Sequence, residues 1–536
     1  MPLVALKPFK TPFKAAAAQV SQLFNNPPPT GGLNLRDPIS NMAPQDALVL
    51  ENFIPRQQGV ELRKGNQVHT TALGGVTKFE SIFAYNAADS ADNKMFAAFN
   101  GAIYDVTSEP AAITSASATG STNDQWWTTH FATTSGIYLL AVSPGAGYWT
   151  YDPIGGWVDR TSACTNLTTA ARTVAVWKQR VWFTLDGSSD VYYLANVNSI
   201  QDTATVMPMG SVLRNGGSIS SLINWTIDAG FGVDDYLVAV GTEGDIGVWQ
   251  GTDPTDASKF GLKGIWYIGP VPKYGVYFTP FGGDVMILSQ QGLIPMSKVV
   301  SGQYNEAASN LMPASKVQAE LVKAIRTLKN VEAWNVIMVP QESILIIQLP
   351  VGTYNLYTQF VMNTITGAWC TFSNMDMVCT TLLDGQLYYA DATGKVIKGL
   401  FGNVADADIN GANGTTIQGE LQGAFNSYNT PAQLKRFGLV RPVFISSGPP
   451  AVKVSMNTQY NVTSVTGVPY FSDPEGALWD TGLWNESYFA ASSNTYQAWA
   501  GINNLGYYGS LRMKVKGLPG TLLTSAHVLY ELGGVM

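Results

Sequence analysis

Histidine is the side chain most often used for proton transfer near neutral pH, and this 536-residue chain contains three, His69, His130 and His527. They lie far apart in the sequence, without the HExxH spacing of a zinc site. The spacing favours separate, hydrogen-bonded histidines in strands or loops over a serine triad or a histidine-rich metal cluster. We therefore predict no catalytic residue among them.

Paired carboxylates are a second chemistry to consider, because glycosidases, some of them propellers, place two acids on either side of a sugar bond. Asp234 and Asp235 are adjacent, so on a strand they point to opposite faces and cannot easily act on one bond. Asp253 and Asp256 lie in a loop, where acids commonly cap turns. The sequence favours turn-capping acids over a catalytic pair.

Residues 406–411 read DADING, which matches the first half of an EF-hand calcium loop. The twelfth position of such a loop needs a bidentate glutamate, but here it is Ile417, and no flanking helices are expected. Asp406, Asp408 and Asn410 are thus a calcium candidate that lacks two requirements. We predict a polar linker between domains instead of a metal site.

Aromatic faces can stack on sugars, and Trp126, Trp127, Trp149 and Trp157 could form such a platform. In a β-rich chain with 14 tryptophans, buried packing is the simpler expectation. The sequence also lacks a GxxxxGK[ST] phosphate loop, a GxSxG elbow and a GxGxxG turn. We therefore expect no cofactor and no enzyme activity.

The composition bounds the class of protein that must position these residues. Hydrophobic residues make up 46% of the chain and charged residues 13%, about half the charged share of a typical soluble domain, which suggests that partners cover much of the surface. The net charge of −7 argues against wrapping nucleic acid but suits a surface past which DNA slides. No apolar run is long enough to span a bilayer, and no export signal is evident.

Three cysteines, Cys164, Cys370 and Cys379, lack metal-type spacing and cannot all pair with one another. This pattern is typical of a protein made in a reducing compartment. We expect the three side chains to be small members of the core.

Over residues 75–402, short β-branched or aromatic strands alternate with turns rich in glycine, aspartate and asparagine. Asn100-Gly101 and Asp384-Gly385 are strong signals for tight hairpins, because both central positions tolerate positive φ. Successive hairpins without alternating helices indicate an all-β fold. The loose periodicity favours a β-propeller of roughly six blades, with about five to eight allowed.

One segment departs from this pattern. Ser315 and Gln318 fit a capping box, and Val317, Leu321, Ile325 and Leu328 follow at helical spacing. We predict a helix near residues 315–329, inserted between blades. Its apolar stripe is expected to dock on its own propeller, and a contact with another subunit is the alternative.

The sequence predicts five regions. They are a basic arm and linker over residues 1–32, which contains Lys7, Lys10 and Lys14; a leading β segment over 33–74; the propeller over 75–402; a linker over 403–417; and a C-terminal β-sandwich-like domain over 418–536.

The leading segment contains four short motifs. Residues 31–38 read GGLNLRDP, residues 42–47 read MAPQDA, residues 50–56 read LENFIPR, and residues 59–65 read GVELRKG. This opening resembles that of the tail nozzle proteins of short-tailed, podovirus-type bacteriophages, also called tail tubular protein B or packaged-DNA stabilisation proteins. The resemblance is at the level of motifs and covers residues 31–65.

The resemblance implies a structural virion protein that forms a homohexamer. The ring would continue the DNA-ejection channel below the portal and the tail adaptor ring, retain packaged DNA until infection, and dock tail fibres or spikes. Viral DNA would pass through the lumen without sequence-specific binding, and no stable membrane insertion is expected. The subunit would be assembled in the host cytoplasm and found in the virion tail. Arg36, Arg56, Arg63 and Lys64, which lie in the motifs, are the expected contacts between rings.

A propeller that binds or cleaves glycans is the alternative reading of the same chain. A hexameric mass in solution would favour the ring, whereas a monomer that cleaves polysaccharide would favour the glycan protein.

Overall fold

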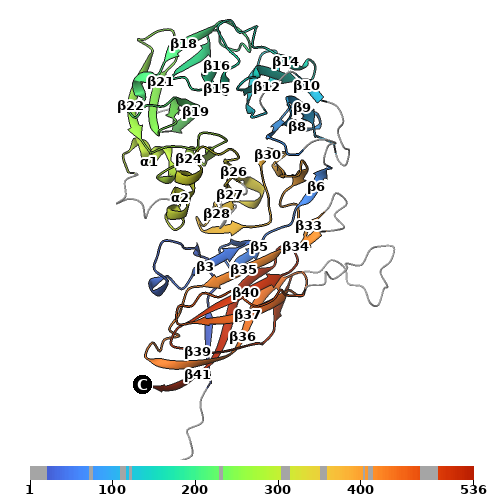
Figure 1. Cartoon of the computed structure of the whole chain (residues 1–536), viewed down its shortest axis with the longest axis vertical. Coiled ribbons are helices and arrows are strands. Elements are labelled where there is room, and N and C mark those ends of the chain that lie inside the picture. Colours follow the sequence, from blue (N-terminus) through green and yellow to red (C-terminus); the bar gives the residue numbers. More distant parts are fainter. Residues whose placement is uncertain are drawn as a thin grey trace, which may run out of the picture.

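The computed structural model describes residues 21–71, 77–108, 116–119, 124–228, 233–303, 314–350, 359–402, 405–407, 414–470 and 493–535. Figure 1 shows a ring of β-sheets above an elongated β domain, with the C-terminus at the foot of the lower domain. The all-β fold with a β-propeller that the sequence predicts is confirmed. Residues 1–20, with the three lysines of the expected arm, lie outside the described residues.

The first half of the ring consists of four blades, each a four-stranded antiparallel sheet. Their strands are β7 (Ser81–Tyr85), β8 (Lys94–Phe99), β9 (Ala102–Asp105) and β10 (Ala116–Thr119); β11 (Trp127–Thr133), β12 (Gly136–Ser143), β13 (Gly147–Asp152) and β14 (Gly156–Asp159); β15 (Ala171–Trp177), β16 (Arg180–Leu185), β17 (Asp190–Leu194) and β18 (Ala204–Pro208); and β19 (Ile219–Asp228), β20 (Val233–Gly241), β21 (Asp245–Gly251) and β22 (Phe260–Tyr267).

The second half of the ring is less regular. A three-stranded sheet comprises β23 (Phe278–Phe281), β24 (Asp284–Ser289) and β25 (Gly292–Pro295); the next blade comprises β26 (Asn335–Val339), β27 (Ile344–Gln348), β28 (Gln359–Asn363) and β29 (Trp369–Phe372); and the last comprises β30 (Cys379–Leu383), β31 (Gln386–Ala390) and β32 (Val396–Lys398), completed by β6 (Gln67–Thr70). The ring closes where β30 packs beside β7. The blade number lies within the expected range of about five to eight.

The turn chemistry expected from the sequence is present at two hairpins. Asn100 and Gly101 join β8 to β9 with φ of 51° and 76°, and Asp384 and Gly385 join β30 to β31 with φ of 51° and 76°. Both central residues therefore adopt the left-handed conformation that these residue types accept at low cost.

The helical segment contains α1 (Met296–Val300) and α2 (Gln318–Leu328). The apolar stripe of α2 is buried against its own propeller, next to β25, as expected. The expected capping box is wrong: Val317 precedes the helix without a side-chain cap, and the Gln318 amide donates to the Gln291 carbonyl at 2.7 Å. Neither helix in the described part of the chain is long and apolar enough to cross a membrane.

The lower domain contains two facing β layers. One layer consists of β1 (Ser21–Asn26), β4 (Phe53–Pro55), β5 (Val60–Leu62), β36 (Gln433–Ser446), β38 (Asn494–Gln497), β39 (Ala500–Gly506) and β41 (Leu522–Val535). The other consists of β2 (Gly32–Leu33), β3 (Asp46–Glu51), β35 (Gln418–Gly423), β37 (Ala451–Thr458) and β40 (Gly509–Lys516). Side chains from both layers belong to one core cluster, which includes Phe53, Phe437, Met513 and Tyr530.

The second layer does not stop at the domain boundary. Strand β3 pairs with β35 on one side and with β29 of the propeller on the other, so a nine-stranded sheet runs from one domain into the next. The pairing of β29 with β3 joins Thr371 to Glu51, and the backbone N–H of Asn52 donates to the Thr371 carbonyl at 2.8 Å, so backbone hydrogen bonding connects the two domains.

The segments before and after the propeller differ from their expected boundaries. Strand β1 lies within the region interpreted as an exposed arm and pairs with β41. The leading segment contributes β2 to β5 to the lower domain and β6 to the last blade. Within the expected linker, β33 (Ala405–Ala407) pairs with β34 (Gly414–Thr416). Four short 3-10 helices, Ile39–Asn41, Ser90–Asp92, Gly210–Val212 and Pro340–Glu342, complete the described elements.

Candidate functional site at the propeller axis

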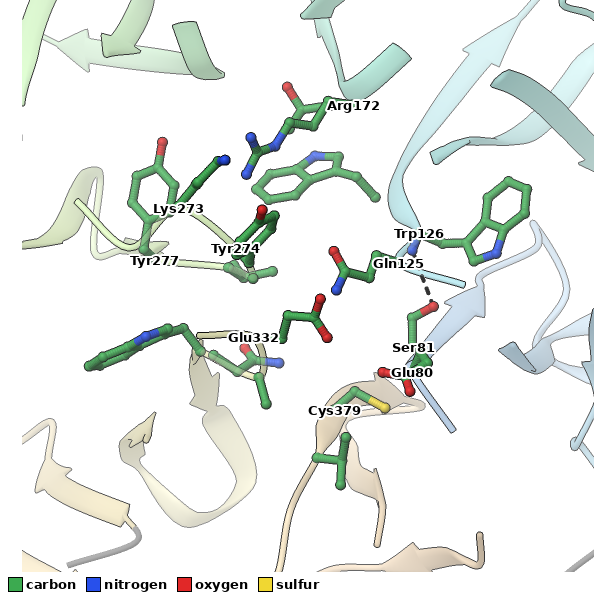
Figure 2. A pocket seen from close by; sticks show the side chains of 18 of the residues that line it. Glu80, Ser81, Gln125, Trp126, Arg172, Lys273, Tyr274, Tyr277, Glu332 and Cys379 are labelled. Carbon is green, nitrogen blue, oxygen red and sulfur yellow. Dashed lines mark hydrogen bonds between the residues drawn. The ribbon is translucent and has the colours of Figure 1, made fainter. Parts of the chain in front are cut away.

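A cavity of about 290 Å³ lies where the innermost strands of the ring converge. Its lining comes from the starts of β7, β11, β15, β19, β26 and β30 and from the segment before β23. The inner strands of a propeller surround one axis, so residues at one end of each strand meet around that axis. Figure 2 shows side chains from several blades around this cavity.

One wall of the cavity is cationic. The Arg172 guanidinium lies 5.2 Å from the centre of the Tyr274 ring, and the Lys273 ammonium lies 5.1 Å from the same centre. Arg172 is 9% exposed and donates from Nη1 to Asp186 Oδ1 at 2.9 Å. Two cations thus lie over one aromatic ring, whose quadrupole stabilises each of them.

Carboxylates occupy other parts of the wall. Glu80 pairs with Lys78 at 3.1 Å, whereas Glu332 is exposed and has no hydrogen-bond or ion-pair partner among the described residues. In Figure 2, Glu332 and Glu80 lie on the side of the cavity away from Arg172. The cavity therefore presents opposite charges on different walls.

The segments that carry Lys273 and Glu332 are joined to each other. The backbone N–H of Lys273 donates to the Lys329 carbonyl at 2.7 Å, and that of Val276 donates to the Trp334 carbonyl at 3.0 Å. Gly275 has φ of +85°, and a Cβ there would lie 2.1 Å from the Trp334 carbonyl oxygen. Only glycine allows this close approach, so Gly275 fixes the distance between the two segments.

Backbone strain occurs at the same place. Ala333, directly after Glu332, has φ of 72°, a conformation that costs an alanine roughly 1–3 kcal/mol. Such residues cluster at binding and catalytic sites, where the surrounding structure holds a side chain in a required position. Here the strained residue lies between Glu332 and the buried Trp334.

The potential nucleophiles near the cavity are engaged or protonated. Burial raises the pKa of the Cys379 thiol, which contacts the Phe79 carbonyl oxygen at 3.8 Å. Burial likewise raises the pKa of Tyr277, whose hydroxyl hydrogen-bonds to Ser221. Ser81 donates to the Asp124 carbonyl at 2.5 Å. The arrangement is suited to binding charged groups by hydrogen bonds and ion pairs.

The three histidines lie apart and have separate roles. His69 Nε2 contacts the Val106 carbonyl oxygen at 3.1 Å, and His527 Nδ1 lies 3.3 Å from Arg441. His130 Nε2 accepts from the backbone N–H of Asn86 at 2.9 Å, and desolvation lowers its pKa. Within the described residues no group of three or more histidine, cysteine or acidic side chains is placed to hold a metal.

The carboxylates considered from the sequence are also separated from the cavity. Asp235 pairs with Lys178 at 2.6 Å, and this hydrogen bond lowers the pKa of Asp235. The side chain of Asp234 lies outside the described residues. Asp253 accepts from the Thr255 hydroxyl and backbone, and Asp256 accepts likewise from Ser258. These hydrogen bonds hold the pKa of both loop carboxylates below the ordinary value.

The tryptophans considered as a sugar platform mainly pack on one another. The ring centres of Trp126 and Trp149 lie 6.3 Å apart, and those of Trp126 and Trp157 lie 6.5 Å apart. In Figure 2 the Trp126 ring points away from the centre of the cavity. Trp127 also lines the cavity and contacts Phe278, with ring centres 5.7 Å apart.

The calcium candidate is only partly described. Asp406 accepts from Arg63 at 3.1 Å and from Asn66 at 2.6 Å, so its carboxylate is bound by protein donors. Asp408 and Asn410 lie outside the described residues.

The four cations expected to contact other rings each have a carboxylate partner within the chain. Arg36 pairs with Asp37 at 2.8 Å and lowers the pKa of that carboxyl to about 2. Arg56 and Lys64 both reach Glu342, at 3.6 and 2.5 Å. Arg63 is 1% exposed. A side chain buried to this degree cannot contact another ring, so the prediction for Arg63 is wrong.

Sequence reasoning missed Arg172, Lys273, Tyr274 and Glu332. They come from three separate segments, of which one contains both Lys273 and Tyr274, and no short motif links the three. Their position in the sequence could have identified them, because all four lie at or just before an inner strand of a blade.

No family model matches the chain, and no curated protein matches it. Among solved structures, the chain is similar to BBS1N in complex with ARL6DN, with 10% identity over 40% of this chain and 63% of that chain and a TM-score of 0.27. It is also similar to a Bacteroides uniformis protein assigned as a 6-phosphogluconolactonase, with 15% identity over 38% of this chain and 66% of that chain and a TM-score of 0.26. The chain thus spans slightly less than two thirds of either structure.

Proposed function

We propose that this chain is a structural subunit of a hexameric tail nozzle ring in a short-tailed bacteriophage, where it continues the DNA-ejection channel below the portal and adaptor rings. The observation that carries the proposal is the position of the motifs in residues 31–65. These residues, on which the resemblance rests, form the contacts between the propeller and the lower domain.

The first group of contacts surrounds Asp46. Its carboxylate is 3% exposed and accepts from Lys316 at 2.6 Å and from Asn34 at 2.7 Å. The Lys316 ammonium also donates to the Gly31 carbonyl at 2.8 Å. Two motifs are thereby attached to the segment that precedes α2 of the propeller.

The second group surrounds Arg63, and we call Asn52, Arg63, Ser373 and Asp406 the junction. Arg63 donates to Asn52 Oδ1 at 2.9 Å, to the Ser373 carbonyl at 3.1 Å and to both oxygens of Asp406. Asn52, which has φ of 56°, donates to the Gln418 carbonyl at 2.9 Å. The junction thus joins the lower domain to the segments before and after the last blade.

A ring subunit needs this kind of rigidity. In a closed ring each copy must present the same two surfaces at a fixed angle, because an error in the angle accumulates around the symmetry axis. A continuous sheet and a buried polar network meet this need better than a flexible linker would. The net charge of −7 per copy also suits a channel that must not adhere to DNA.

The test uses phage particles assembled without this chain. We expect purified chain to bind such particles at the tail, to add six copies by cryo-electron microscopy, and to restore DNA retention and infectivity. Chain with Arg63→Met, which breaks the junction, should restore neither, whereas Lys263→Met, at an exposed lysine of β22, should act as wild type. Particles that retain DNA and infect equally well without the chain would refute the proposal.

Glycan binding or cleavage is retained as a second proposal because of one observation. The axial cavity combines the aromatic side chains of Trp127 and Tyr274 with the carboxylates of Glu80 and Glu332. A monomeric mass near 57.6 kDa together with release of sugars from a bacterial surface polysaccharide would favour this function. A hexameric mass without sugar release would favour the ring.

A further inference from the structure

The cationic wall of the axial cavity is incompletely neutralised. Arg172 and Lys273 lie near the same Tyr274 ring, but the one carboxylate paired with them, Asp186, contacts Arg172. The Lys273 ammonium has no hydrogen-bond or ion-pair partner among the residues that the structure describes. Like charges that share a partly desolvated site repel each other, so this wall attracts an additional negative group.

The opposite charge is provided by a neighbouring segment. Glu332 also lacks a partner in the described chain and lies beside Ala333, whose backbone is strained. The paired backbones on either side of Gly275 hold the backbone of Glu332 next to the segment of Lys273. Lys273 and Glu332 thus line one cavity but do not form an ion pair with each other.

We propose that the axial cavity binds a small zwitterion with a carboxylate at one end and a protonated amine at the other. The carboxylate is held by Lys273 and Arg172, and the amine by Glu332. The chain between the two charged groups lies against the aromatic side chains of Tyr274 and Trp127, which line the same cavity. A ligand with both charges pairs with the cations and with Glu332, whereas a ligand with one charge leaves either the cations or Glu332 without a partner.

This binding function is separate from the ring function. The cavity lies on the axis of one propeller, and its lining residues take no part in the junction between the domains. Loss of zwitterion binding therefore leaves particle assembly intact, and a chain without a role in particles can still bind the zwitterion.

The test uses a series of ω-amino acids from 3-aminopropanoate to 6-aminohexanoate, because the series varies the distance between the two charges. Pentanoate and pentylamine provide the single charges, and glucuronate represents a sugar acid. Binding to the full chain is measured by calorimetry and by tryptophan fluorescence. We expect one member of the series to bind at least about tenfold more tightly than pentanoate, pentylamine or glucuronate.

Two substitutions test the contributions of Glu332 and Lys273 one at a time. In Glu332→Gln the best amino acid should bind no more tightly than pentanoate, and in Lys273→Met at least about tenfold more weakly than to the wild-type chain, because only Arg172, already paired with Asp186, remains. Neither side chain has an ion-pair partner among the described residues, so Glu332→Gln should melt at the wild-type temperature, and Lys273→Met slightly below it, because it loses the contact with the Tyr274 ring. Lys263→Met, an exposed lysine of β22, is the matched control and should bind as wild type.

Either of two results would overturn the proposal. The first is that no amino acid of the series binds the wild-type chain at about 10 mM, well above the dissociation constant expected for two charged contacts. The second is that glucuronate binds as tightly as the best amino acid and is unaffected by Glu332→Gln, which would assign the cavity to sugar acids.

Discussion

The junction and the axial cavity both contain arginine and carboxylate side chains, but they differ in how completely these groups are paired. At the junction, all three guanidinium nitrogens of Arg63 donate to protein acceptors at 2.9 to 3.2 Å. At the cavity, Lys273 and Glu332 have no such partners in the described chain, and Ala333 is strained. Complete pairing suits a rigid connection between domains, whereas incomplete pairing leaves charge available for a ligand.

The largest effect should come from the junction. Arg63→Met removes a buried guanidinium and its hydrogen bonds to Asn52, Ser373 and Asp406, and we expect a loss of about 3 kcal/mol in the free energy of unfolding. Urea denaturation followed by circular dichroism measures this loss. Arg36→Met, which removes an exposed ion pair, should cost less than about 1 kcal/mol. If the two substitutions cost the same free energy of unfolding, the buried junction stabilises the fold no more than an exposed ion pair does.

A smaller effect should come from the backbone that shapes the cavity. In Gly275→Ala the new Cβ would lie 2.1 Å from the Trp334 carbonyl oxygen, at a φ of +85°. We expect a loss of about 1–3 kcal/mol by urea denaturation, because the two paired segments must separate. Gly261→Ala, where a Cβ meets nothing within 4 Å, is the matched control. If Gly275→Ala behaves like Gly261→Ala, the close approach of the segments does not hold the cavity together.

Acid should weaken one contact between adjacent blades. His130 accepts a hydrogen bond from Asn86, and desolvation lowers its pKa in the folded state. The unfolded chain therefore binds the proton more readily, so stability is highest above the unfolded pKa of about 6.5 and falls as the pH drops through the folded value. We expect a loss of less than about 1 kcal/mol, because His130 is exposed and solvent weakens the contribution of its one hydrogen bond.

Thermal melts between pH 8 and 5 measure this loss, compared with His130→Gln, which has a carbonyl acceptor but no titration near neutral pH. A pH dependence that is the same in wild type and His130→Gln would exclude His130 as its source.

The smallest effect should be a gain in stability. Ala333→Gly removes the strain of a φ of 72°, and we expect a gain of roughly 0.5–1 kcal/mol in urea denaturation. Ala257→Gly, in an exposed loop with an ordinary φ, should instead be neutral or slightly destabilising. A loss of stability in Ala333→Gly would show that the alanine side chain contributes more than its backbone strain costs.

Local signals in the sequence predicted local structure. Asn100-Gly101 and Asp384-Gly385 mark tight hairpins because few residue types tolerate positive φ, and the spacing of Val317, Leu321, Ile325 and Leu328 marks α2. The signals failed where partners are distant in the sequence. Strand β1 pairs with β41, and Gln22 accepts from Tyr530 across a separation of 508 residues. No local pattern specifies such a partner.

The same limit applies to the sites. Arg63 was expected to contact another ring because it lies in the motifs that carry the resemblance. Its burial depends on Asp406, 343 residues away, whose neighbours in the sequence indicate a polar linker or a calcium candidate. The axial cavity could not be predicted because its lining comes from separate blades and depends on the closure of the ring.

Strand β6 has a consequence for how the protein is made. It completes the last blade by pairing with β32, and Val396 bonds to Thr70 across a separation of 326 residues. During synthesis, β6 must therefore wait for most of the chain to leave the ribosome before its partner exists. Early blades can form one after another in this interval, but the circle is completed late, and a truncated product lacks the strands that close it.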